Sequence, residues 1–110
     1  MSSFEKTYIY VDDIRDYTNW NKDLSYGKEI IAVKTYKEAI EALKTCISHK
    51  SNITIDLDHD LGCKRTGYDV AKWIIASGYN NVRFKIHSMN PVGAQNIREM
   101  LLHYGYEEIK

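Results

Sequence analysis

Three short stretches of the chain concentrate side chains that could do chemistry. The densest, Asp56–Asp60, has the sequence D-L-D-H-D, and the others are the acidic pair Asp12–Asp13 and the polar run His87–Asn90. Like charges repel and burial raises carboxylate pKa values, so such clusters lower stability and suggest a site. Carboxylates without cysteine ligands favour a hard cation such as Mg²⁺ or Mn²⁺. Such a cation can neutralise phosphate oxygens and activate a water, and histidines can supply a general acid or base near neutral pH.

Each of these stretches follows a run that is typical of a β-strand. Thr7–Val11, Ile53–Ile55 and Val82–Ile86 are rich in apolar, β-branched and aromatic residues, and Glu29–Lys34 has the same character. A parallel strand that is buried on both faces stays apolar until it leaves the sheet. The change from I-T-I to acidic residues therefore predicts that the third strand emerges there, at the edge where open α/β sheets bind ligands.

Helical patterns alternate with these strands. Thr35 opens one helix with a capping box, Tyr68–Ser77 forms a second, and Asn90 caps a third whose first residue is a proline. Tyr106–Ile109 could form a short fifth strand at the edge. Residues 14–28 favour turns and predict a loop with at most one helical turn.

The alternation predicts one α/β domain over residues 1–110 with a parallel, flavodoxin-like sheet. Right-handed crossovers give the strand order 2-1-3-4 with a short fifth strand, and helices on both faces. Carboxyl ends of parallel strands share one edge, so residues that follow them should converge although they are far apart in sequence. The side chains expected to converge are Asp12, Asp13, Asp58, Asp60, His87 and Ser88.

Charge and composition limit the classes of partner. The chain has 15 basic and 15 acidic residues and a formal net charge of zero, so no global field favours duplex DNA or an anionic membrane. Cys46 and Cys63 lack metal-type spacing and suggest reduced thiols. No signal peptide and no membrane-spanning run of about 18 apolar residues is apparent. We therefore expect a cytoplasmic protein; its oligomeric state is not indicated.

Four motifs between Tyr8 and Met100 together resemble the cyclic-phosphate processing receiver family. They read Y-V-D-D-I-R, L-D-H-D-L-G, T-G-Y-D-V-A-K-W-I and I-H-S-M-N-P-V-G-A-Q-N-I. The resemblance implies a flavodoxin-like sheet, an acidic receiver-type pocket and the handling of cyclic phosphates on RNA ends or nucleotide signals. Such small receiver-like domains are often encoded by bacteria and their phages, which implies a link to phage or bacterial defence.

The same family is similar to phosphorelay receivers, and the chain departs from the receiver pattern. Asp12–Asp13 matches the receiver acids that bind metal, and Asp58 matches the phosphoacceptor. However, His59–Asp60 follows where receivers usually have apolar residues, and His87 stands near the switch threonine or serine. No lysine-proline pair follows a fifth strand. A degenerate phosphorelay receiver is therefore an alternative rather than the expected function.

Three sets of residues are candidates for the site. The expected ligands of Mg²⁺ or Mn²⁺ are Asp12, Asp13, Asp58 and Asp60. The expected catalytic residues are Asp58, His59 and His87. The candidates for binding a phosphate or ligand are Ser88, Asn90, Gly93, Lys64 and Arg65.

Structural alternatives accompany several of these candidates. Ser88 and Asn90 could contact an anion at a helix N-terminus, but could equally serve only as helix caps. Lys64–Arg65 could clamp a phosphate or form an ordinary solvated loop. His87 could be a satisfied core histidine, whereas His59 lies between two acids, which favours a functional role.

Two mechanisms fit a cyclic phosphodiester on a small nucleotide or an RNA end. In the first, a cation held by Asp12–Asp13 and Asp58 orients a water while a histidine protonates the leaving oxygen. In the second, His59 and His87 form an acid-base pair without metal. The residues could also bind a cyclic nucleotide without cutting it, as a sponge would, so the choice between a metal-dependent phosphodiesterase and a binding protein stays open.

Overall fold

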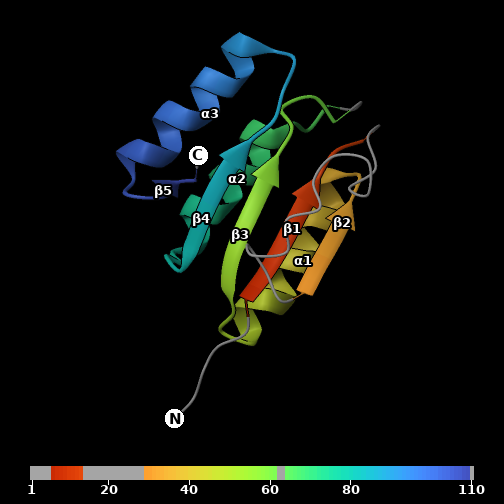
Figure 1. Ribbon diagram of the computed structural model, residues 1–110, viewed down its shortest axis with the longest axis vertical. Coiled ribbons are helices and arrows are strands. Elements are labelled where there is room, and N and C mark those ends of the chain that lie inside the picture. Colours follow the sequence, from red (N-terminus) through yellow and green to blue (C-terminus); the bar gives the residue numbers. More distant parts are fainter. Residues whose placement is uncertain (1–5, 14–28, 62–63, 110) are drawn as a thin grey trace.

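Five parallel strands form one sheet in the order β2-β1-β3-β4-β5 (Figure 1). The computed structural model describes residues 6–13, 29–61 and 64–109. The predicted order and the short fifth strand are confirmed. The strands are β1 (Lys6–Val11), β2 (Glu29–Val33), β3 (Asn52–Leu57), β4 (Val82–Ile86) and β5 (Glu107–Glu108).

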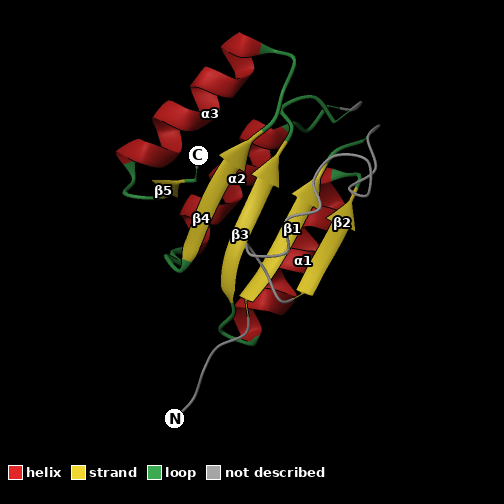
Figure 2. Cartoon of the chain, viewed as in Figure 1, coloured by secondary structure: helices red, strands yellow, loops and turns green. Residues whose placement is uncertain are grey.

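Three helices connect the later strands, as Figure 2 shows: α1 (Tyr36–Ser48), α2 (Gly67–Ser77) and α3 (Pro91–His103). The hydroxyl of Thr35 accepts a hydrogen bond from the Glu38 amide at 3.1 Å, which confirms Thr35 as the cap of α1. The Glu38 carboxylate accepts from the Lys34 amide at 2.8 Å, so the second bond of the predicted capping box goes to Lys34 instead of Thr35. Side-chain caps of this kind satisfy amide groups that have no partner inside a helix. The helices therefore begin where the sequence signals place them.

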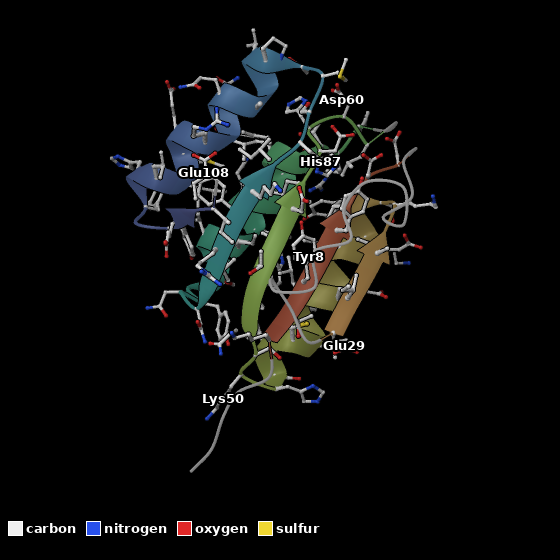
Figure 3. All side chains as sticks on the ribbon, viewed as in Figure 1. Tyr8, Glu29, Lys50, Asp60, His87 and Glu108 are labelled. Atoms are coloured by element: carbon white, nitrogen blue, oxygen red, sulfur yellow. The ribbon has the colours of Figure 1, made fainter. Side chains whose placement is uncertain are left out.

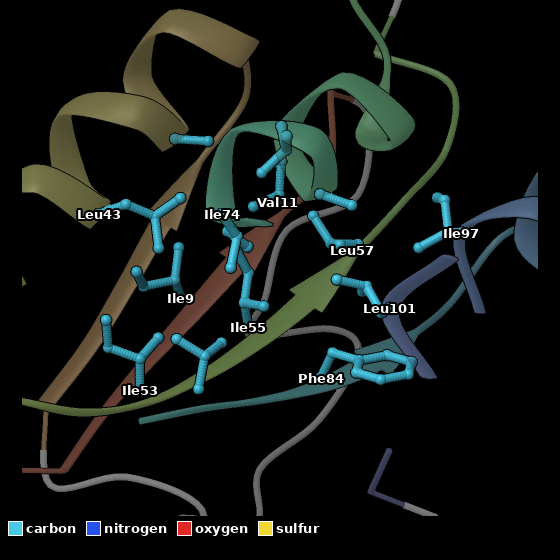
Figure 4. Packing of buried hydrophobic residues seen from close by; sticks show 14 of the residues in the cluster. Ile9, Val11, Leu43, Ile53, Ile55, Leu57, Ile74, Phe84, Ile97 and Leu101 are labelled. Atoms are coloured by element: carbon cyan, nitrogen blue, oxygen red, sulfur yellow. The ribbon is translucent and has the colours of Figure 1, made fainter. Parts of the chain in front are cut away.

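The apolar core lies between one face of the sheet and these helices (Figure 4). Each of the three helices connects strands in the same direction across the sheet, so right-handed crossovers place all three on the same face. Leu43 of α1, Ile74 of α2 and Leu101 of α3 are all almost fully buried in one cluster with Ile55 and Phe84 of the sheet. Among the described residues every helix lies on this face, so the expected helices on the second face stay a prediction.

The second face of the sheet is polar and yet buried. Tyr8 and Tyr10 of β1 and Thr54 and Asp56 of β3 point to this side, and each is at most 2% exposed. The expectation that β3 emerges at the first acid is therefore wrong, because the strand continues through Leu57. A buried carboxylate needs a partner, and the partner of Asp56 belongs to the site described below.

No described helix combines the length and apolar character that a bilayer crossing requires. Of the two cysteines, Cys46 is a buried free thiol and Cys63 lies outside the described residues.

Candidate functional site

The backbone of the sheet fixes three polar residues beyond the ends of their strands. The amide of Asp12 donates to a carbonyl of β2 at 3.1 Å, that of Asp58 to β1 at 3.0 Å, and that of His87 to β3 at 2.9 Å. These bonds extend the parallel ladder by one residue at each strand. Figure 3 shows His87 and Asp60 at the carboxyl edge of the sheet, opposite Glu29 at the other end.

His87 is held between two carboxylates in the interior. Its Nδ1 lies 2.5 Å from Oδ1 of Asp56, and its Nε2 lies 2.9 Å from Oδ2 of Asp12. The ring of Tyr10 stacks on the imidazole with 4.8 Å between centroids and an interplanar angle of 4°. The hydroxyl of Tyr8 donates to Oδ2 of Asp56. Each side chain of this network is at most 5% exposed.

The geometry of His87 is that of an imidazolium. A neutral imidazole has one donor and one acceptor nitrogen, whereas both ring nitrogens here face carboxylate oxygens. Burial lowers the pKa of His87, but the hydrogen bonds and negative charges of Asp56 and Asp12 outweigh it, and the pKa is raised overall. The raised pKa and the two acceptor partners favour the protonated ring, which would place a positive charge beside these acids.

Asp58 is the half-buried carboxylate of this edge. Burial raises the pKa of Asp58, and the negative charge of Asp12 raises it further. The positive charge of His87 and hydrogen bonds from the Asp60 amide and the Ser88 hydroxyl lower it without cancelling the rise. A carboxylate with a raised pKa accepts protons more readily, which suits a general base.

His59 lies in the turn that follows Asp58, with its ring against the first turn of α3. Its Nδ1 is 2.9 Å from Oδ1 of Asp60, and its side chain is 19% exposed. Its carbonyl accepts a hydrogen bond from the Gly67 amide at 2.8 Å, so the turn is also tied to the start of α2. No further hydrogen bond within the described part of the chain engages Nε2 of His59.

The polar residues of the β4–α3 connection act as caps. Oδ1 of Asn90 accepts from the Gly93 amide at 2.9 Å, and the hydroxyl of Ser88 accepts from the Asn90 amide at 3.0 Å. Ser88 also bonds to Asp58, which keeps it at the acidic edge. Gly93 is buried at the first turn of α3.

The two basic candidates lie in the connection from β3 to α2. Lys64 and Arg65 are both exposed. The guanidinium carbon of Arg65 lies 4.8 Å from the ring centroid of Tyr36 at the start of α1, a cation–π contact. This contact directs Arg65 toward α1.

One group within the described residues could hold a metal ion. Single ligand atoms of Asp12, Asp58 and His87 all lie within 4.8 Å of one another, whereas Asp13 and Asp60 lie outside this group. The carboxylates of Asp12 and Asp58 fit a hard divalent cation, whose charge would offset the repulsion between them. Because His87 donates to Asp12, the cation would share that carboxylate with the imidazole.

The predicted site residues did not include Tyr8 or Tyr10, and Asp56 was placed in the acidic cluster without a role in the site. Their common signal is alternation: the tyrosines precede Asp12 by four and two residues, and Asp56 precedes Asp58 by two. Side chains two apart in a strand point to the same face. Polar residues at alternate positions of two neighbouring parallel strands would therefore have indicated a polar face that leads to the site.

Solved receiver domains share this fold. The signal receiver domain of a protein assigned as a Luxo repressor from Vibrio parahaemolyticus matches with a TM-score of 0.68 at 24% identity, over 96% of this chain and 76% of that one. The receiver domain of the histidine kinase CKI1 from Arabidopsis thaliana, in complex with Mg²⁺, matches with a TM-score of 0.57 at 16% identity, over 94% and 80%. At these identities the likeness shows the fold alone.

No curated protein matches the chain. A family model, that of the cyclic-phosphate processing receiver domain, matches residues 7–103 and so includes β1 from its second residue, β3, β4 and every candidate site residue named above. The chain therefore belongs to the cyclic-phosphate processing receiver domain family.

Proposed function

We propose that the chain hydrolyses a cyclic phosphate on a nucleotide or an RNA end at the carboxyl edge of the sheet. The observation that carries the proposal is the arrangement around His87, where a buried imidazolium lies between Asp56 and Asp12, and Asp12 approaches a half-buried Asp58. Perturbed acids grouped with a fixed positive charge at a ligand-binding edge are typical of catalytic sites. The family match supports the choice of a cyclic phosphate.

Hydrolysis at this edge needs one group that takes a proton and one that gives a proton. Asp58, whose pKa is raised in the site without a cation, accepts a proton from the attacking water as the new P–O bond forms. The endocyclic P–O bond breaks, and protonated His59 gives its Nε2 proton to the leaving oxygen. His87 is enclosed with both nitrogens on carboxylates, so we assign it to holding Asp12 rather than to proton transfer.

Asp12 and Asp58 would hold Mg²⁺ or Mn²⁺ in this scheme. When bound, such a cation neutralises phosphate oxygens and lowers the pKa of a water. The calorimetric test is titration of the protein with Mg²⁺ and with Mn²⁺, alongside Asp12→Asn. We expect the cation to bind the unaltered chain and to bind Asp12→Asn more weakly. Equal affinities in the two titrations would contradict the assignment of Asp12 as a ligand.

The deciding test of activity is a panel of 2′,3′-cyclic and 3′,5′-cyclic nucleotides incubated with the protein, with and without Mg²⁺ or Mn²⁺. After denaturation, chromatography should show ring-opened products. Asp58→Asn keeps the side-chain volume and should remove the products, whereas Glu41→Gln on the exposed surface of α1 is the matched control and should retain them. Failure of every panel member to react or bind would exclude the proposal.

Capture without cleavage is the second candidate function. The observation that favours it is the enclosure of His87, which removes one of the two expected acid-base histidines from contact with a ligand. A sponge would hold the nucleotide in the presence of a chelator and release it chemically intact on denaturation. The same chromatograms therefore separate capture from hydrolysis.

Phosphorelay signalling is a third candidate, favoured only by the position of Asp58 directly after β3. The described residues place His59–Asp60 next to that carboxylate and supply no lysine to it. We therefore expect no stable aspartyl phosphate after treatment with small phosphodonors. Reductive trapping of a phosphorylated Asp58 with borohydride would favour the receiver function instead.

A further inference from the structure

The ring of His59 lies in a notch on α3 that only a glycine leaves open. A Cβ atom added to Gly93 would lie 2.5 Å from Cγ, 2.6 Å from Cδ2 and 2.8 Å from Nδ1 of His59. Carbon atoms in van der Waals contact are about 3.5–4.0 Å apart, so a side chain at this position would displace the imidazole. Gly93 lies inside a helix and needs no unusual backbone conformation, so its role is to provide space.

The orientation of the ring within this notch is set by Asp60. Oδ1 of Asp60 lies 2.9 Å from Nδ1, so that nitrogen carries the hydrogen when the imidazole is neutral. In the protonated ring of the proposed reaction, Nε2 carries the second hydrogen, and this hydrogen could reach the leaving oxygen. Asp60 was one of the expected metal ligands, but its carboxylate contacts the ring of His59.

We propose that Gly93 and Asp60 are positioning residues that hold His59 for its part in the reaction. Gly93 fixes where the ring lies, and Asp60 fixes which nitrogen faces the ligand. The functional half of this inference rests on the proposed hydrolysis of a cyclic phosphate. The structural half, the dependence of His59 on an empty position in α3, can be tested without any substrate.

The structural test is a double-mutant cycle on thermal unfolding with Gly93→Ala, His59→Ala and the combined variant. Gly93→Ala alone should lower the unfolding midpoint by several degrees, because the new methyl group meets the imidazole. In the His59→Ala background the same change should leave the unfolding midpoint unchanged or raise it, because alanine is a better helix former than glycine. If Gly93→Ala fails to fold, recovery of folding in the combined variant gives the same support.

Gly67 supplies the matched control for this cycle. A Cβ added there would lie 2.1 Å from the carbonyl oxygen of Asp58, which is backbone and stays in place when the His59 side chain is removed. Gly67→Ala should therefore lower the unfolding midpoint by the same amount with and without the His59 side chain. An equal cost of Gly93→Ala with and without the His59 ring, including failure of both variants to fold, would overturn the inference.

The functional test compares two replacements of Asp60. Asp60→Asn keeps an oxygen that accepts from Nδ1 and should retain most of the turnover. Asp60→Ala should lower kcat roughly ten- to a hundredfold, the range known for partners that orient metal-bound histidines. Equal loss in both variants would favour metal ligation by Asp60. If no nucleotide is turned over but the unfolding cycle shows coupling, the proposed function fails and the placement of His59 by Gly93 stands. If a folded Gly93→Ala variant turns over the nucleotide at the unaltered rate, the positioning role of Gly93 alone is overturned.

Discussion

His87 shows how a single residue can organise the edge of a sheet. Its two ring nitrogens join Asp56 inside β3 to Asp12 after β1, and Tyr10 covers its face. A buried carboxylate without a partner would be strongly unfavourable. One imidazolium therefore offsets part of the negative charge of the two buried acids that lie beside Asp58.

The first prediction concerns the pH dependence that follows from His87. Its folded-state pKa is raised, so the stabilisation is fully present below the unfolded value of about 6.5 and is lost as the pH rises through the folded pKa. We expect His87→Gln to be less stable than the unaltered chain at acidic pH, and the difference to shrink toward alkaline pH. Urea unfolding at several pH values measures this, and a constant difference would contradict it.

The second prediction concerns Asp58→Asn. Burial and the charge of Asp12 raise the pKa of Asp58, so the ionised carboxylate is unfavourable in the folded state at neutral pH. We expect the variant to be more stable at pH 7 by on the order of 1 kcal/mol, as is common when a functional residue is replaced. The gain should diminish as the pH falls through the folded pKa of Asp58. Loss of stability at pH 7 would show that the carboxylate is structural.

At this scale the sequence predicted part of the site. Asp12, Asp58 and His87 could be placed together because each follows a strand of a parallel sheet. Asp56 could not, because aspartate is almost never fully buried without a partner, and its partner is 31 positions away in the chain. The contact between His59 and Gly93 also depends on how α3 packs, which no local pattern contains.

The elements next to the site are defined by their first turns. α2 begins with a capping box in which Thr66 accepts from the Tyr68 amide at 3.1 Å and Asp69 accepts from the Thr66 amide at 2.8 Å. α3 begins with Asn90 as its cap and a proline at its first position. Such signals are local, so the sequence could predict where these helices begin.

The third prediction separates the capping role of Asn90 from phosphate binding. Asn90→Ala should lower the free energy of unfolding by about 1 kcal/mol, because the Gly93 amide loses its acceptor. Asn90→Asp also caps and should keep the stability. If Asn90 only caps, Asn90→Asp should bind a cyclic nucleotide as well as the unaltered chain does, measured by equilibrium dialysis. Much weaker binding would indicate that Asn90 contacts the phosphate, because the new charge would repel it.

At the scale of the whole molecule, the right-handedness of crossover connections predicted the order of the strands. The spacing of apolar residues predicted the core. Every described helix packs on one face, where Leu43, Ile55 and Phe84 are fully or almost fully buried. The polar character of the other face was not predicted, because Tyr8 and Tyr10 match the composition of an ordinary strand. Its burial depends on tertiary packing, which a strand propensity does not describe.

The fourth prediction tests the core with two leucines. Leu43→Ala should lower the free energy of unfolding by about 2–5 kcal/mol, because the side chain is 0% exposed and its removal leaves a cavity. Leu102→Ala is the matched control; that side chain is 49% exposed, and the change should stay within about 0.5 kcal/mol. Denaturant unfolding measures both. Similar losses in the two variants would contradict the placement of the core.

The central claim is that the acidic edge opens a cyclic phosphate, and ³¹P NMR observes that event directly. The unaltered chain, incubated with a 2′,3′-cyclic nucleotide and Mg²⁺ or Mn²⁺, should convert the cyclic diester resonance into that of a phosphate monoester. The folded Asp58→Asn variant should leave the cyclic resonance unchanged over the same period. Conversion at the same rate by Asp58→Asn would contradict the account, because the reaction would then not depend on the carboxylate placed at its centre.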